Sequence, residues 1–179
     1  MSETLANEER GVLLDVARQS IENGLQQGCA LLVNPTDYTE ALRPLRATFV
    51  TLASAGKLRG CIGALEATKS LVADVADHAF SAAFEDPRFA PLRQAEWPEV
   101  SLHIAVLSPP EPMSVSSEDD LLEQLRPGVD GLILTLGERR ATFLPSVWGT
   151  LPDPYIFLAQ LKQKAGLPLD FWSEDLCAE

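Results

Sequence analysis

The alternation of apolar and polar residues between positions 49 and 65 predicts a β-hairpin. Phe49–Leu52 is apolar and contains β-branched side chains, which favours a strand. The cluster Ser54–Lys57 is typical of a turn, and Leu58–Leu65 supplies the returning strand. The returning strand contains the hexapeptide LRGCIG at residues 58–63, where a cation, a thiol and two glycines lie close together in the sequence.

The returning strand is expected to present the cation and the thiol on the same side. Side chains alternate between the two faces of a strand, so Arg59, Cys61 and Gly63 are predicted on one face and the even-numbered residues on the other. Strand interiors normally avoid glycine. Gly60 and Gly63 therefore predict either a β-bulge or the close approach of a ligand to the backbone.

The rest of the chain alternates between helical and β patterns. Apolar residues recur at helical spacing in four stretches, at residues 8–27, 71–84, 118–125 and 154–164. Further strands are predicted at residues 100–107, 132–136 and 140–144, and the last two form a second hairpin. Because hairpins pair their strands antiparallel, the pattern predicts an α+β fold, with an antiparallel or mixed sheet and flanking helices.

The chain is long enough for one domain, and its proline-rich middle divides it. The chain has 179 residues, which suits a single domain. The segment SPPEP at residues 108–112 cannot continue a central strand, because proline lacks the backbone N–H donor. We therefore predict one domain over residues 1–179, with two lobes at 1–112 and 113–179.

The charge of the chain narrows the choice of partners. The formal net charge is −12, which argues against nucleic acid and against an anionic membrane surface as main partners. No apolar run approaches the roughly 20 residues of a membrane span. The acidic, polar start is unlike a signal peptide, and three widely spaced cysteines do not suggest a disulfide framework. A cytoplasmic location is the simplest expectation.

Several common chemistries are disfavoured by the motifs. The two histidines and three cysteines have no spacing typical of a metal site, so no metal is expected. Neither a P-loop nor a dinucleotide-binding fingerprint occurs. The segment LPSVWG at residues 144–149 lacks the glycine that precedes the serine of a nucleophile elbow, which disfavours a serine hydrolase.

The hexapeptide and the strand before it resemble the signature of a known family. LRGCIG, preceded by FVTL, is similar to the hallmark of the AMMECR domain family, which takes its name from a chromosomal region linked to Alport syndrome, midface hypoplasia and elliptocytosis. Other stretches of the chain resemble the family in the same order, namely DPRF at 86–89, HIAVLSPPE at 103–111, RRATFLPSV at 139–147 and KAGL at 164–167. The resemblance covers nearly the whole chain.

The resemblance implies an α+β domain of two lobes, with the hexapeptide near a groove between them. Microbial members of the family resemble partners of a Memo-like protein, which has an extradiol-dioxygenase-like fold, and of a radical S-adenosylmethionine enzyme. The three names give the label AmmeMemoRadiSam, and the resemblance implies a component of a modification pathway. The chain itself lacks a cysteine triplet for an iron–sulfur cluster, so no cofactor is expected in it.

The groove is expected to bind a small molecule or a peptide, and the turn at residues 86–89 and the hairpin at 139–147 are predicted to border it. Cys61 and His103 are the candidate catalytic residues, as nucleophile and base. The candidate ligand-binding residues are Arg59, Gly60, Gly63, Asp86, Arg88 and Thr142.

Two interpretations of Cys61 remain open at this point. A cation within about 4–6 Å stabilises a thiolate, so Arg59 would make the thiol reactive. Burial opposes this effect, and Cys61 would then be a small packing residue beside two glycines. The corresponding functions are an enzyme or enzyme component that uses Cys61, and a non-catalytic protein-interaction module. Cys29 is expected to be buried, and His78 to be solvated, because it lies off the apolar stripe of its helix.

Overall fold

The chain forms two compact units. The computed structural model describes residues 5–179. The first unit is Met1–Pro109 and the second is Pro110–Glu179. None of the helices in residues 5–179 combines the length and the apolar character needed to cross a membrane.

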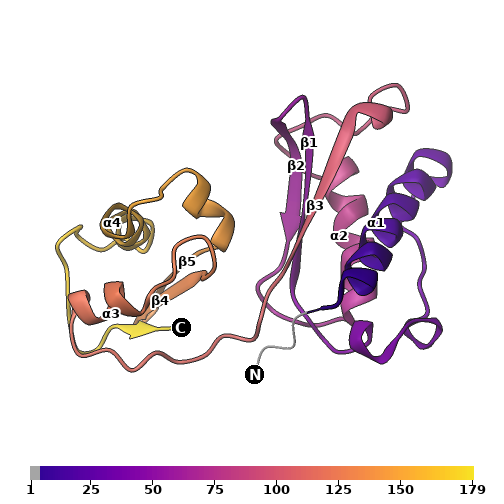
Figure 1. Ribbon diagram of the computed structural model, residues 1–179. Helices are drawn as coiled ribbons and strands as arrows, with labels where there is room; N and C mark the ends of the chain where they lie inside the picture. Colours follow the sequence, from indigo (N-terminus) through magenta and orange to yellow (C-terminus); the bar gives the residue numbers. More distant parts are fainter. Residues whose placement is uncertain (1–4) are drawn as a thin grey trace. The chain divides into compact units, whose positions relative to one another are not determined.

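The first unit is a three-stranded antiparallel sheet with two helices on one face (Figure 1). The strand order is β2-β1-β3, so β1 is central and the other two strands lie at the edges. The strands are β1 (Thr48–Ser54), β2 (Lys57–Gly63) and β3 (Val100–Val106), and the helices are α1 (Asn7–Gln27) and α2 (Leu71–Phe84). Short 3-10 helices occur at η1 (Pro35–Asp37), η2 (Glu40–Leu42) and η3 (Trp97–Glu99).

The predicted hairpin is confirmed, and it contains a β-bulge. Ser54 pairs with Lys57 across a two-residue turn, in which Ala55 and Gly56 both have positive φ, of 50° and 74°. Such a turn matches the twist of the flanking strands. The register then shifts between Leu52 and Ala53. Leu52 pairs with Gly60 and Ala53 pairs with Leu58, so Arg59 has no partner on β1. The strict alternation of faces predicted for residues 58–63 is therefore wrong at its start.

The core of the first unit lies between the sheet and the two helices. Alternate residues of β1, Val50 and Leu52, are fully buried against apolar residues of α1 and α2. Burying such side chains contributes about 1.5–3 kcal/mol each. Figure 1 shows that both helices lie on the same face of the sheet, so the residues of β1 between these positions point to a face without a helix of this unit.

The second unit is a smaller sheet packed with two helices. Its strands are β4 (Leu132–Leu136), β5 (Arg139–Phe143) and β6 (Cys177–Ala178), in the order β5-β4-β6 and all antiparallel. Its helices are α3 (Glu118–Gln124), α4 (Pro154–Lys164) and the 3-10 helix η4 (Pro145–Gly149). Trp148 stacks on Phe157 in the core, with ring centroids 3.7 Å apart. The two units together confirm the α+β class.

Two expectations about single residues are wrong. Cys29 is exposed, because α1 ends at Gln27 and the chain then leaves the core without a regular element. The His78 side chain is only 16% exposed, since its Nδ1 lies 3.1 Å from the buried Asp74 carboxylate and 3.2 Å from the hydroxyl of Thr48. This polar cluster joins α2 to the first residue of β1, and the helical periodicity of the sequence does not predict it.

Candidate functional site

The outer edge of β2 is closed at Cys61 by two side chains. The Cys61 N–H donates to Asp86 Oδ2 at 2.9 Å, and Arg88 Nη2 donates to the Cys61 carbonyl at 3.0 Å. Asp86 and Arg88 also form an ion pair of 2.7 Å. We call this pair the edge clamp, because it takes the place of a neighbouring strand at one residue of an edge strand.

The edge clamp follows from how α2 ends. The helix stops at Phe84, and the next turn carries Asp86 and Pro87, where the proline disfavours helical angles in the residue before it. Asp86 is buried, and its Oδ1 accepts both the backbone N–H and the Nε–H of Arg88. The hydrogen bonds between the Asp86 carboxylate and Arg88 fold the turn, so the guanidinium of Arg88 lies beside Cys61.

The Cys61 thiol contacts the hydroxyl of Thr51. The two residues are direct partners across β1 and β2, and Thr51 Oγ1 lies 3.0 Å from Cys61 Sγ. The N–H of Cys61 points outward to Asp86, so the two residues form a non-hydrogen-bonded pair, in which side chains approach most closely. Cys61 is half-buried and lies outside the apolar core. The sequence pattern does not predict a role for Thr51, because only the bulge brings this residue opposite the thiol.

Arg59 is directed to another part of the site than the thiol. Its Nε donates to Glu96 Oε1 at 3.0 Å, and its Nη2 donates to the carbonyl of Ala90 at 2.9 Å. Its guanidinium also lies 5.9 Å from the ring centroid of Phe89. Arg59 thus ties β2 to the loop after α2, and the cation hydrogen-bonded to Cys61 itself is Arg88.

The two glycines of the hexapeptide permit close packing of backbone. A Cβ atom on Gly60 would lie 2.1 Å from the carbonyl oxygen of Ala82 in α2. A Cβ atom on Gly63 would lie 2.3 Å from the carbonyl oxygen of Thr48. Protein neighbours therefore account for the absence of a side chain at both positions.

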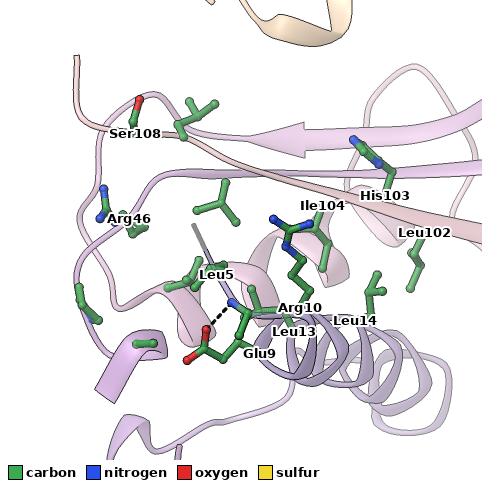
Figure 2. A pocket seen from close by; sticks show the side chains of 16 residues that line it. Leu5, Glu9, Arg10, Leu13, Leu14, Arg46, Leu102, His103, Ile104 and Ser108 are labelled. Carbon is green, nitrogen blue, oxygen red and sulfur yellow. Dashed lines mark hydrogen bonds between the residues drawn. The ribbon is translucent and has the colours of Figure 1, made fainter. Parts of the chain in front are cut away.

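His103 lies two strands away from Cys61. Both residues are register partners of Thr51, His103 from β3 and Cys61 from β2. Adjacent strands are about 4.8 Å apart, which puts the two backbones about 10 Å from each other. His103 is exposed, and Figure 2 shows its ring pointing away from α1. Among residues 5–179 no hydrogen bond joins the imidazole to the thiol.

Thr142 belongs to the second unit. It lies on β5 opposite Ile133 of β4, and its carbonyl accepts a hydrogen bond of 2.8 Å from Lys164 Nζ. Its side chain is half-buried.

The carboxylates of the site are held in the charged form. The hydrogen bond from Arg88 lowers the pKa of Asp86 far below its usual range, against the opposing effect of burial, and the Cys61 N–H lowers it further. The same bond raises the pKa of Arg88. Hydrogen bonds from Arg59 and from the Arg93 backbone lower the pKa of Glu96 to about 2. Both ion pairs are therefore fully charged at neutral pH.

This chain was compared with models of known protein families, with other proteins and with solved structures. The family model AMMECR1 matches residues 14–178, which include both strands of the hairpin and the edge clamp. The chain belongs to the AMMECR1 family. A protein of Methanothermobacter thermautotrophicus is 41% identical over 169 residues, covering 93% of this chain and 86% of that protein. A protein of Thermotoga maritima is 35% identical over 159 residues, covering 87% of this chain and 86% of that protein.

A solved structure has the same fold. The crystal structure of the uncharacterized protein PH0010 from Pyrococcus horikoshii matches this AMMECR1-family chain with a TM-score of 0.83 and 32% sequence identity. The match covers 97% of this chain and 88% of that one.

Within residues 5–179, no group of three or more His, Cys, Asp or Glu side chains is arranged to hold a metal ion.

Proposed function

We propose that this AMMECR1-family protein binds a small molecule or a peptide on the sheet face that carries Cys61. The observation that supports the proposal best is the environment of the thiol. Its sulfur lies outside the apolar core, 3.0 Å from the Thr51 hydroxyl, while its backbone is held in place by the edge clamp. A cysteine kept for packing alone is expected inside the core. Either the hydroxyl or the thiol can donate in this contact, which places a polar group directly beside the sulfur.

Arg88 is the cation best suited to contact a ligand beside Cys61. Its side chain is 53% exposed, whereas that of Arg59 is 15% exposed and occupied by Glu96 and Ala90. The guanidinium of Arg88 uses Nη2 and Nε for the edge clamp and the Cys61 carbonyl. An anionic group of a ligand would bind to the exposed side of this guanidinium, with Asp86 and Arg59 as positioning residues and Gly60 and Gly63 as sites of close packing.

His103 would border the ligand on the other side of Thr51. The strand spacing of about 10 Å means that a base role toward Cys61 requires a path through the Thr51 hydroxyl or through the ligand. Hydrogen bonding of a ligand to the exposed imidazole requires no such path. We therefore propose His103 first as a binding residue and second as a proton acceptor.

The binding face would serve a modification pathway of the AmmeMemoRadiSam type, with Memo-like and radical S-adenosylmethionine proteins as partners. The sequence lacks a cysteine triplet for an iron–sulfur cluster, so the radical step would belong to the partner. This chain would hold the molecule to be modified, or the peptide that carries it.

Native mass spectrometry and cysteine alkylation test the binding site. We expect the purified chain to carry an additional mass that Cys61→Ser removes. We expect Thr51→Val to change the rate at which iodoacetamide alkylates Cys61, because the polar contact of the sulfur is lost. The matched control is Thr135→Val, because Thr135 is the register partner of Cys177 and no hydrogen bond joins their side chains. The proposal would be refuted if Cys61 were alkylated at the same rate in Thr51→Val as in the wild type and no bound mass were found.

A protein-interaction module without catalysis is the second candidate. The packing of the hexapeptide favours it, because Gly60, Gly63 and Arg59 are each explained by contacts inside the protein. Chemical cross-linking of this chain to the Memo-like and radical S-adenosylmethionine proteins of the same organism distinguishes the two. The interaction module requires cross-links that survive Cys61→Ser, whereas ligand binding through the thiol does not.

A further inference from the structure

The two edge strands of the first sheet, β2 and β3, differ in whether side chains bind their outer backbone groups. The outer edge of β2 is closed at Cys61 by the edge clamp. β3 has one neighbouring strand, β1, within the described part of the chain. The Leu107 N–H donates to Ala47 O at 2.9 Å on the β1 side. Backbone groups of a strand point alternately to its two sides, so Leu102, Ile104 and Val106 direct their N–H and C=O groups to the free edge.

Within residues 5–179, no side chain or covering segment protects the free edge of β3. None of the side chains in residues 5–179 is hydrogen-bonded to the backbone of Leu102, Ile104 or Val106. The strand sequence VSLHIAV contains neither a proline nor a lysine, arginine, aspartate or glutamate. Natural edge strands are normally protected by such residues, by bulges or by a covering segment. An edge left open from Leu102 to Val106 is a template for another strand.

A groove runs beside this edge. It has a volume of about 850 Å³ and is lined on one side by Leu102, Ile104 and Val106 of β3 and on the other by Glu9, Arg10 and Leu14 of α1 (Figure 2). The groove lies entirely within the first unit. Its volume is within the range of about 300–1,000 Å³ typical of ligand sites. Its walls therefore combine an unpaired backbone with apolar side chains.

Two arginines line the groove, Arg10 and Arg46. Among residues 5–179, no Asp or Glu lies within ion-pair distance of Arg10 or Arg46, although the chain has a net charge of −12. Figure 2 shows Arg10 extending from α1 toward β3. The one acidic residue of the groove, Glu9, already accepts the Ala6 N–H at 2.8 Å. The unbalanced charge of the groove is thus positive.

We infer that this groove binds an extended segment of a partner protein, which adds a strand to β3 and pairs acidic side chains with Arg10 and Arg46. Main-chain hydrogen bonds to Leu102, Ile104 and Val106 supply the binding energy that does not depend on sequence. Apolar side chains of the segment contact Leu14, and the acidic ones select the partner. About five residues of strand, at 3.3 Å each, span the open edge from Leu102 to Val106.

The experiment uses the full chain and a displayed library of random nonapeptides as the probe. Enriched sequences are synthesised, and their affinities are measured for the wild type, Arg10→Glu and the control Arg18→Glu. Arg18 lies on the same helix, is exposed and does not line the groove. We expect acidic, β-prone sequences to be enriched, with affinity about tenfold weaker for Arg10→Glu and unchanged for Arg18→Glu.

Amide hydrogen exchange shows whether the peptide binds as a strand. In the free protein the amides of Leu102, Ile104 and Val106 exchange faster than those of His103 and Ala105, and bound peptide slows the three fast ones selectively. The inference is overturned if no peptide is enriched over empty support, if Arg10→Glu binds as well as the wild type, or if the three amides stay fast. Protection that rises with protein concentration without peptide would identify a second copy of the chain as the occupant, and would overturn it too.

Discussion

Asp86 holds Cys61 through the backbone: its buried carboxylate accepts the Cys61 N–H at 2.9 Å, while Arg88 binds the carbonyl of the same residue at 3.0 Å. The position of the thiol is thereby fixed from outside the sheet, and its side chain remains available to Thr51. This relationship explains why the turn after α2 and the hexapeptide belong to one site although 25 residues separate Cys61 from Asp86.

Replacing Asp86 by Asn should destabilise the first unit. Hydrogen bonds to a charged group contribute about 1.5–3 kcal/mol each, so Asp86→Asn is expected to lower the free energy of unfolding by an amount in that range. Hydrogen exchange of the Cys61 amide should also become faster. Asp130→Asn is the matched control, because the Arg126–Asp130 pair is more exposed and does not hold a strand edge. If both substitutions lowered the free energy of unfolding equally, the edge clamp would stabilise the protein no more than an ordinary surface ion pair.

The hexapeptide glycine at position 60 should not tolerate a methyl group. In Gly60→Ala the new Cβ would lie 2.1 Å from the backbone oxygen of Ala82, and such overpacking typically costs about 1–3 kcal/mol. Gly11→Ala should instead stabilise the chain by about 0.5–1 kcal/mol, because Gly11 lies in α1 with open space around it. Urea denaturation of both variants measures the difference, and a neutral Gly60→Ala would contradict the close packing.

The ion pair of Arg59 with Glu96 should contribute to stability in a defined pH window. The folded-state pKa of Glu96 is about 2, below the value of about 4.3 for an unfolded chain. Its contribution is therefore complete above pH 4.3 and is lost as the pH falls toward 2. The melting temperature of Glu96→Gln should fall less steeply than that of the wild type across this window. Glu66→Gln, at an exposed position of the same unit, should follow the wild type.

The buried ion pair of the second unit should respond unequally to loss of its two partners. Lys162 is fully buried, and its Nζ lies 2.7 Å from Glu118, whose side chain is 32% exposed. Glu118→Ala leaves a buried ammonium group without its carboxylate, which typically costs about 3–5 kcal/mol. Lys162→Met leaves a carboxylate that water can reach, so its cost should be smaller. Chemical denaturation of both variants tests this order, and the reverse order would contradict it.

The sequence by itself determined the class of fold and most of its elements. The apolar stripe of residues 71–84 and the β-branched run after Thr48 produce a helix and a strand almost where periodicity predicts them, because both patterns are local. The turn between Ser54 and Lys57 was equally visible, since glycine at position 56 supplies one of the two positive φ angles that the turn needs. The resemblance of LRGCIG and its neighbouring motifs to the AMMECR family was also in the sequence, and the family match confirms it.

Only the tertiary structure decided which side chains meet. Continued without interruption, the register set by the Ser54–Lys57 pair would place Thr51 opposite Gly60, and a slip of one residue moves every later side chain to the other face. The bulge near Leu52 makes that slip, because Gly60 must lie against the backbone of Ala82 in α2. Thr51 thus meets Cys61, while Arg59 joins Glu96. Contacts between residues 25 to 37 positions apart depend on how α2 packs on the sheet, and the local pattern of residues carries no information about that packing.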